Sequence, residues 1–119
     1  MNAKPITPFQ QRVYAALRHV PAGCVTTYRL LARHLGCRSA RAVGQALRRN
    51  PFAPEVPCHR VIAADLRLGG FCGARAGAQI RRKQALLAKE GVAFDAEGRL
   101  VEKRRVFGFP GKKQVEPGG

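Results

Sequence analysis

The chain has 119 residues, 45% of them hydrophobic, and its 22 Lys and Arg outnumber seven Asp and Glu to give a formal net charge of +15. This length fits one domain that buries about two thirds of its extended surface, and it leaves no room for a second sizeable one. The charge exceeds what solubility requires and favours a polyanion as partner, while the lack of an apolar run of about 20 residues excludes a membrane span.

The first predicted element is a helix over about residues 8–19. The stretch Thr7-Pro8-Phe9-Gln10 has the pattern of a capping box with proline at the first helical position. Apolar residues then recur at the spacing of one helix face, at Phe9, Val13, Ala16, Leu17 and Val20. Pro21-Ala22-Gly23 ends the helix, and a short extended piece follows at residues 24–26.

Two short helices joined by a tight turn come next. Thr27 is placed to cap the first, which Gly36 closes, and Ser39 to cap the second, over about residues 39–49. Apolar residues line one side of the second helix, and the other side carries Arg41, Gln45, Arg48 and Arg49. The pattern is typical of a helix-turn-helix whose second helix binds DNA. A helix pair that touches no nucleic acid, in a generally basic protein, is the alternative.

A thiol beside a potential base follows the second of these helices. Asn50-Pro51 ends the helix, and a proline-rich connector leads to Val56-Pro57-Cys58-His59-Arg60-Val61-Ile62. Pro57 stiffens the chain before Cys58, and Val61 and Ile62 favour a strand after it, which places the thiol at a rigid loop-to-strand junction. Cys58 and His59 are therefore a candidate reactive pair, with an inert buried cysteine and a structural histidine as the alternative.

The remaining chain is predicted to hold one hairpin and one long helix. Residues 61–63 and 67–68 would form a short β-hairpin, and residues 69–73 a flexible glycine turn. A helix is expected from about Ala76 to Glu90, and Gly91 would end it. Its residues of interest are Ile80, Gln84 and Leu87 along one face, and Arg81, Arg82, Lys83 and Lys89, which add positive charge.

The C-terminal part completes the predicted architecture. Residues 92–106 contain β-like pieces around a turn at Asp95-Ala96-Glu97-Gly98. The last residues are rich in Gly, Pro and Lys, a composition that is typical of disorder. We therefore predict a mainly α, winged helix-turn-helix-like domain with a short β-hairpin over residues 1–107, and a disordered basic tail over residues 108–119.

The cysteines and the N-terminus bear on the compartment. The four cysteines, Cys24, Cys37, Cys58 and Cys72, are widely spaced without a Cys-x-x-Cys pair, so we expect reduced thiols and no metal site. Residues 1–5 are not followed by the apolar core of a signal peptide. Both observations favour a cytoplasmic protein, and the basic charge would associate it with the bacterial nucleoid.

Six motifs in order resemble the DNA-binding and catalytic domain of the 6-O-alkylguanine-DNA alkyltransferases, which are suicide DNA-repair proteins. The motifs are Val25-Thr26-Thr27-Tyr28 with Leu31-Ala32, Ala40-Arg41-Ala42-Val43-Gly44-Gln45-Ala46, Asn50-Pro51, Pro57-Cys58-His59-Arg60-Val61-Ile62, Gly69-Gly70-Phe71, and Leu86-Leu87-Ala88-Lys89-Glu90-Gly91. The resemblance covers about residues 9–91, which is most of the chain.

The resemblance implies a role for each of four catalytic residues. Cys58 would accept the alkyl group, and His59 would take the thiol proton through a water molecule. Glu90 would orient and charge the histidine, and Asn50 would tie the recognition helix to the active-site turn. Because a thiolate rather than a thiol attacks an sp³ carbon, a base beside the cysteine is the chemistry that such a transfer needs.

The resemblance also implies the residues that handle DNA. Tyr28 would contact the flipped base and its phosphate, and Arg41 would fill the vacated stack. Gln45 and Arg48 share the exposed face of the recognition helix with Arg41 and are the further DNA-binding candidates. The base pocket would be lined by Tyr28, Val61, Phe71 and Cys72.

The implied function is single-turnover repair of double-stranded DNA that contains alkylated guanine, by a monomer without a cofactor. The alternative is a non-catalytic alkyltransferase-like lesion sensor that recruits another repair-pathway protein. Those proteins are similar in length but typically carry tryptophan where this chain has Cys58. A helix-turn-helix regulator is disfavoured by the Pro-Cys-His context and by Glu90, and a thiol hydrolase by the lack of an evident oxyanion loop.

Overall fold

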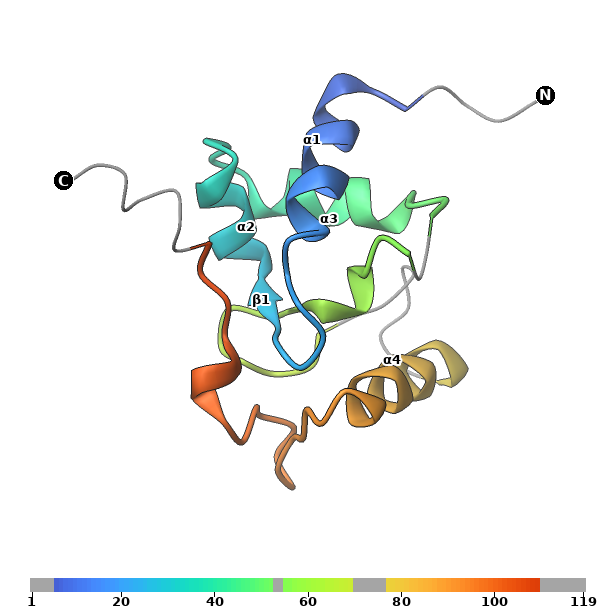
Figure 1. The fold of residues 1–119 in the computed structure, drawn as a ribbon, viewed down its shortest axis with the longest axis vertical. Coiled ribbons are helices and arrows are strands. Elements are labelled where there is room, and N and C mark those ends of the chain that lie inside the picture. The colour runs from blue at the N-terminus through green and yellow to red at the C-terminus, as the bar shows by residue number, and fades with distance from the viewer. Residues whose placement is uncertain (1–5, 53–54, 70–76, 110–119) are drawn as a thin grey trace, which may run out of the picture.

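The computed structural model describes residues 6–52, 55–69 and 77–109. Their elements in chain order are α1 (Pro8–Leu17), β1 (Thr26–Thr27), α2 (Tyr28–His34), α3 (Ala40–Arg48), the 3₁₀ turn η1 (Cys58–Arg60), β2 (Val61–Ile62), α4 (Ala78–Lys89) and the 3₁₀ turn η2 (Lys103–Arg105). Figure 1 shows α1, α2 and α3 gathered in one half of the molecule and α4 in the other. The mainly α, helix-turn-helix-like fold is thus confirmed. None of the helices in these ranges is long and apolar enough to cross a membrane.

Helix α1 begins as its sequence predicts. The Gln10 backbone N–H donates to Thr7 Oγ1 and the Thr7 N–H donates to Gln10 Oε1, both at 3.0 Å, which completes the capping box. The helix ends at Leu17, two residues before its predicted end, although Val20 is still completely buried. The chain therefore leaves α1 through a turn that stays packed against the core.

The two helices of the predicted helix-turn-helix are both capped by the expected side chains. Thr27 Oγ1 accepts the Leu30 N–H and Ser39 Oγ accepts the Ala42 N–H, each at 3.0 Å. Gly36 closes α2 at a φ of +71°, a conformation that glycine adopts without strain. The predicted boundaries of α3 agree with the observed helix to within one residue.

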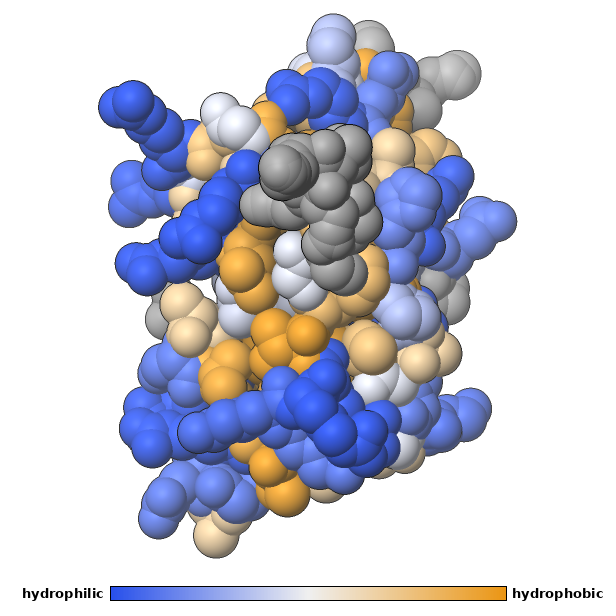
Figure 2. All heavy atoms as spheres, turned by 60° about the vertical axis from the view of Figure 1, so that its left-hand side comes forward, coloured by the Kyte–Doolittle hydropathy of each residue, from blue (hydrophilic) through white to orange (hydrophobic). Residues whose placement is uncertain are grey.

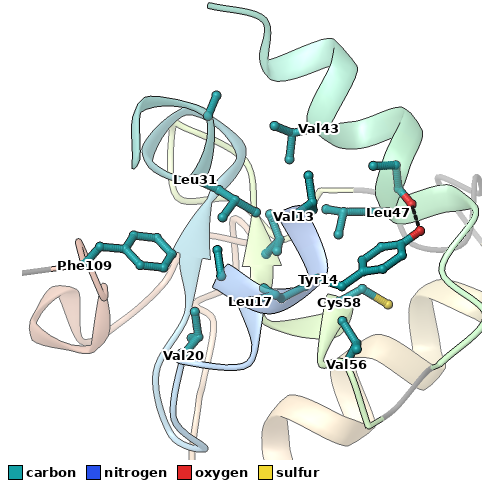
Figure 3. Packing of buried hydrophobic residues seen from close by; sticks show 14 residues of the cluster. Val13, Tyr14, Leu17, Val20, Leu31, Val43, Leu47, Val56, Cys58 and Phe109 are labelled. Carbon is teal, nitrogen blue, oxygen red and sulfur yellow. Dashed lines mark hydrogen bonds between the residues drawn. The ribbon is translucent and has the colours of Figure 1, made fainter. Parts of the chain in front are cut away.

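The core fixes which side of α3 faces outward. Val43, Ala46 and Leu47 of α3 are buried against α1 and α2, and the Tyr14 hydroxyl of α1 donates to the Ala46 carbonyl at 2.7 Å (Figure 3). Figure 3 also shows Cys58 beside Tyr14 in the same cluster. Cys58 therefore packs in the same cluster of residues that orients α3.

The predicted β-hairpin after the cysteine is wrong in its pairing. Strand β2 pairs in parallel with β1, with Thr26 opposite Val61 and Thr27 opposite Ile62. The chain does turn back, since the Ala63 N–H donates to the Arg67 carbonyl at 2.9 Å, but Arg67 forms its antiparallel bridge with Arg99. Periodicity within residues 61–68 could not reveal a partner strand 35 residues earlier in the chain.

Helix α4 differs from its prediction at two side chains, Lys83 and Gln84. It spans Ala78–Lys89, and Gly91 follows with a φ of +86°. Lys83 was expected only to add positive charge to the helix, but it is completely buried. Its ammonium donates to the carbonyls of Val61 at 2.8 Å and Leu68 at 2.6 Å. Its spacing explains this position, because Lys83 lies on the same helix face as Leu87, four residues later. Gln84, which was placed on one face with Ile80 and Leu87, is exposed.

The C-terminal segment packs back onto the first half of the molecule. The turn at residues 95–98 is present, bracketed by a bridge between Phe94 and Leu100. Val106 forms a parallel bridge with Val25, next to β1. Phe109 is buried and its ring stacks on His34 with centroids 4.2 Å apart, so the packed chain extends two residues past the predicted domain end at residue 107. The rest of the predicted tail, residues 110–119, lies outside the described residues.

The contribution of the Ser39 cap to the stability of α3 can be measured directly. Replacing Ser39 by Ala removes the acceptor of the Ala42 N–H and should lower the free energy of unfolding by about 1 kcal/mol, measured by denaturant titration. Ser39→Asp retains a capping oxygen and should restore most of this loss. Equal stability of all three proteins would contradict the assigned cap.

Candidate functional site

Cys58 begins a single 3₁₀ turn that is held from both sides. The Cys58 N–H donates to the Val56 carbonyl at 2.8 Å, and the Arg60 N–H donates to the Pro57 carbonyl at 2.9 Å. Val56 and Pro57 are buried, Cys58 is 9% exposed and His59 is 3% exposed. The turn therefore places a nearly buried thiol and imidazole on adjacent residues of a constrained backbone.

The cysteines and acidic residues provide no metal site within the described ranges. Cys24, Cys37 and Cys58 are reduced, and Cys72 lies outside the described residues. No group of three His, Cys, Asp or Glu side chains converges in the part of the chain that the structure describes.

Asn50 connects the end of α3 to the cysteine turn. Its Nδ2 donates to the Val56 carbonyl at 3.1 Å, and its Oδ1 accepts the Phe52 N–H at 2.8 Å. The Val56 carbonyl in turn accepts the Cys58 N–H. One amide side chain thus links the C-terminal end of the predicted recognition helix to the residue that holds the Cys58 backbone.

His59, Arg60 and Glu90 form the polar centre of the site. His59 Nε2 lies 3.0 Å from Glu90 Oε2, the same oxygen that accepts from Arg60 Nη2 at 2.8 Å. Arg60 Nε donates to the other oxygen of Glu90 at 3.0 Å, so the guanidinium binds the carboxylate through two parallel hydrogen bonds. Arg60 and Glu90 are each 17% exposed. The sequence-predicted pair His59 and Glu90, 31 residues apart, is thus in direct contact.

The charges in this cluster determine the state of the imidazole. Burial alone would raise the pKa of Glu90, but hydrogen bonds from Arg60 and His59 outweigh it and hold that pKa below its usual value. Burial lowers the pKa of His59, and the hydrogen bond to Glu90 offsets only part of this effect. At neutral pH, Glu90 is an acceptor without a proton, so the neutral His59 must carry its proton on Nε2. Nδ1 is then the basic nitrogen.

The predicted DNA-binding residues lie on or beside α3. Arg41, Gln45 and Arg48 are exposed, and their spacing of four and three residues places them on one side of the helix. Tyr28 begins α2 and is half-buried. A Cβ atom at Gly44 would lie 4.0 Å from the Tyr28 ring and one at Gly69 would lie 3.8 Å from it, so the ring sits where both backbones come close.

The predicted base pocket is only partly described. Val61 is completely buried and belongs to the core cluster, so its side chain is no open pocket wall. Phe71 and Cys72 lie outside the described residues.

Figure 2 shows strongly hydrophilic side chains at both ends of one molecular face, with a band of apolar side chains between them. Positive charge is not confined to α3, since Arg29, Arg33 and Arg104 are exposed as well.

Sequence reasoning missed two residues at this site. Arg60 binds Glu90 and also donates to the Val20 carbonyl at 2.8 Å, and Lys83 binds the carbonyl of Val61, the first residue after the cysteine turn. A signal existed for both. Arg60 lies between the buried His59 and a buried strand, and Lys83 shares the apolar face of α4, so each charge needed a partner inside the protein.

Comparisons with known proteins agree with this geometry. Residues 8–92 match the family model described as 6-O-methylguanine DNA methyltransferase, DNA binding domain. The chain is 46% identical over 86 residues to the methylated-DNA--protein-cysteine methyltransferase of Salmonella typhimurium, covering 71% of this chain and 47% of that protein. It is 53% identical over 68 residues to the DNA base-flipping protein of Thermus thermophilus, covering 57% of this chain and 46% of that protein.

A solved structure is similar over nearly its whole length. The crystal structure of S. pombe Atl1 in complex with damaged DNA containing O6-carboxymethylguanine is 28% identical, with a TM-score of 0.71, and the match covers 87% of this chain and 98% of that one. The chain thus spans about half the length of the curated relatives it matches. The predicted family resemblance is confirmed.

The charge states of His59 and Glu90 predict how stability depends on pH. Because the pKa of His59 is lowered from 6.5 in the folded protein, the unfolded chain takes up its proton first as the pH falls below about 6.5. The total loss of stability should be about 1.4 kcal/mol for each pH unit by which the pKa of His59 in the folded protein lies below 6.5. The stability that Glu90 contributes is fully present above pH 4.5, its usual pKa. It is lost as the pH falls from 4.5 through the lower pKa of Glu90 in the folded protein.

The test compares the wild type with H59Q in urea unfolding from pH 7.5 to 5. The wild type should lose stability below about pH 6.5, and H59Q, whose amide does not titrate, should lose less over the same interval. Parallel curves for the two proteins would contradict the neutral, buried state assigned to His59.

Proposed function

The chain belongs to the 6-O-methylguanine DNA methyltransferase family, whose DNA-binding domain it contains, and on this basis we propose that it repairs 6-O-alkylguanine in double-stranded DNA by moving the alkyl group to Cys58. The observation that carries the proposal is the hydrogen bond of His59, the residue after Cys58, to Glu90, a carboxylate that Arg60 also binds. It supports a base next to the nucleophile, which is what a thiol of ordinary pKa needs at neutral pH.

The proposed reaction is a single displacement. The Cys58 thiol gives its proton to Nδ1 of His59, through a water molecule, and the Sγ thiolate attacks the alkyl carbon on guanine. The S–C bond forms as the C–O6 bond breaks, and the electron pair stays on the guanine O6. The proton that His59 took from the thiol is then returned to the base through water, which restores neutral guanine and neutral His59. The product thioether is stable, so each protein molecule acts once and the proposed step uses no cofactor.

The reacting carbon must leave the base stack before this step. Flipping a nucleotide out of the duplex costs a few kcal/mol, which contacts to the phosphates and a side chain that replaces the base can offset. We assign the replacing side chain to Arg41, because it is exposed near the start of α3. Gln45 and Arg48 would bind the DNA along the same side, and Tyr28 would contact the flipped base.

The remaining parts of the proposal concern the pocket and the surroundings. Phe71 and Cys72 would complete the base pocket with Tyr28, and Asn50 would transmit the position of α3 to the Cys58 turn. The acting unit would be one domain and a monomer. Since its substrate is DNA, we place it in the cytoplasm, at the nucleoid.

The second candidate function is lesion sensing without transfer. The match to almost the full length of S. pombe Atl1 is the observation in its favour. A sensor, however, has no need for a thiol beside an imidazole that is held by a paired carboxylate, and all of these groups are present here. We therefore favour transfer over sensing, and a partner protein is required only if transfer fails.

Intact-protein mass spectrometry separates the two functions. After the protein is mixed with a duplex that carries one 6-O-methylguanine, transfer predicts a stoichiometric gain of one methyl group, located on Cys58 by peptide mapping. C58S should gain none but should still bind the duplex. Tight binding by the wild type without any change in mass would refute transfer and leave the sensor as the function.

A further inference from the structure

Arg60 is the one residue of the described site that spans two distant segments. Its Nη1 donates to the Val20 carbonyl, just after α1, while Nε and Nη2 bind Glu90 at the end of α4. Val20 is completely buried, so this carbonyl is a fixed anchor. The guanidinium therefore holds the carboxylate at a defined place relative to His59, which follows Cys58 on the same turn as Arg60.

The charge balance of the cluster gives Arg60 a second effect. Arginine stays protonated in proteins, so Arg60 and Glu90 cancel each other when His59 is neutral. Protonating His59 would then leave a net charge of +1 on three side chains that are 4%, 17% and 17% exposed. Without Arg60, Glu90 and a protonated His59 would form a neutral pair, and the imidazole would hold its proton more tightly.

We propose that Arg60 is a positioning residue for the Cys58 and His59 pair: it shares Glu90 with His59 and thereby fixes both the place of the carboxylate and the neutral resting state of the imidazole. This inference rests on the proposed function, because it assigns a purpose to the state of His59. The effect of Arg60 on the protonation of His59 can be measured without DNA.

Other charges near His59 act in known directions. Glu90 and Lys83 face it from α4, and Arg60 faces it from its own turn. Glu90 raises the pKa of His59, and both cations lower it. Lys83 remains in place when Arg60 is replaced, because its ammonium is held by the carbonyls of Val61 and Leu68. A change in the titration of an Arg60 variant therefore reports the loss of Arg60 itself.

Sharing the carboxylate also directs the proton during the proposed reaction. Because Arg60 stabilises Glu90 as an anion, the carboxylate orients the Nε2 proton of His59 without removing it. The proton of Cys58 can then go only to Nδ1, which leaves an imidazolium opposite the new thiolate. The cation on Arg60 thus limits His59 to accepting one proton at one nitrogen.

The experiment is an NMR titration of His59 in the full chain. R60M removes the positive charge and both hydrogen bonds of the guanidinium to Glu90. The midpoint of the His59 titration should then rise by about one pH unit, the size expected for losing a neighbouring charge. R60K keeps a cation and should shift the midpoint by less than half as much. R104M, which removes the arginine of an exposed Arg104–Glu102 ion pair, is the matched control and should cause no shift.

The outcomes separate this inference from the proposed function. If R60M does not fold, R60Q, which is also neutral but can still hydrogen-bond, takes its place with the same expected shift. An unchanged midpoint in the neutral variant, or an equal shift in R60K, would overturn the inference. If the wild type transfers methyl but the neutral Arg60 variant leaves the midpoint of the His59 titration unchanged, only the role of Arg60 is refuted. If the midpoint shifts as expected but the wild type transfers no methyl, only the proposed function is refuted.

Discussion

The structure of the site depends on one constraint: a largely buried carboxylate must stay ionised, and Glu90 does so by binding two donors from the cysteine turn. Burying a charge is costly unless it is paired and hydrogen-bonded. The pairing joins the end of α4 to η1, and through Arg60 it reaches the chain just after α1. Segments 20, 60 and 90 residues into the chain are thereby fixed around the thiol, and the state of His59 follows from this pairing.

The same turn is also fixed from the side of α3, the proposed DNA-binding helix. Burial of Val43, Ala46 and Leu47 turns the Arg41 side of α3 outward, and Asn50 links the end of that helix to Val56. Tyr14 binds the Ala46 carbonyl and lies in the same cluster as Cys58. A displacement of α3 on binding DNA would therefore be transmitted through short, hydrogen-bonded contacts to the backbone of the thiol.

Features encoded by neighbouring residues could be predicted from the sequence, and features that need distant partners could not. The caps Thr7, Thr27 and Ser39 and the helix-closing Gly36 and Gly91 each act within a few residues, so the helices were found close to their true ends. The parallel pairing of β1 with β2 was missed because it joins separate segments. For the site, the family resemblance named His59 and Glu90. Arg60 was left without a role and Lys83 was expected only to add positive charge, since their partners are backbone carbonyls and a carboxylate far along the chain.

The most direct test of this account is the tautomer of His59, because the proposed proton transfer requires a neutral imidazole whose free nitrogen is Nδ1. Two-bond ¹H–¹⁵N correlation spectra of the protein at pH 7 distinguish the two tautomers and the imidazolium by their nitrogen shifts. We expect a protonated Nε2, hydrogen-bonded to Glu90, and an unprotonated Nδ1. A proton on Nδ1, in either the other neutral tautomer or the imidazolium, would contradict it.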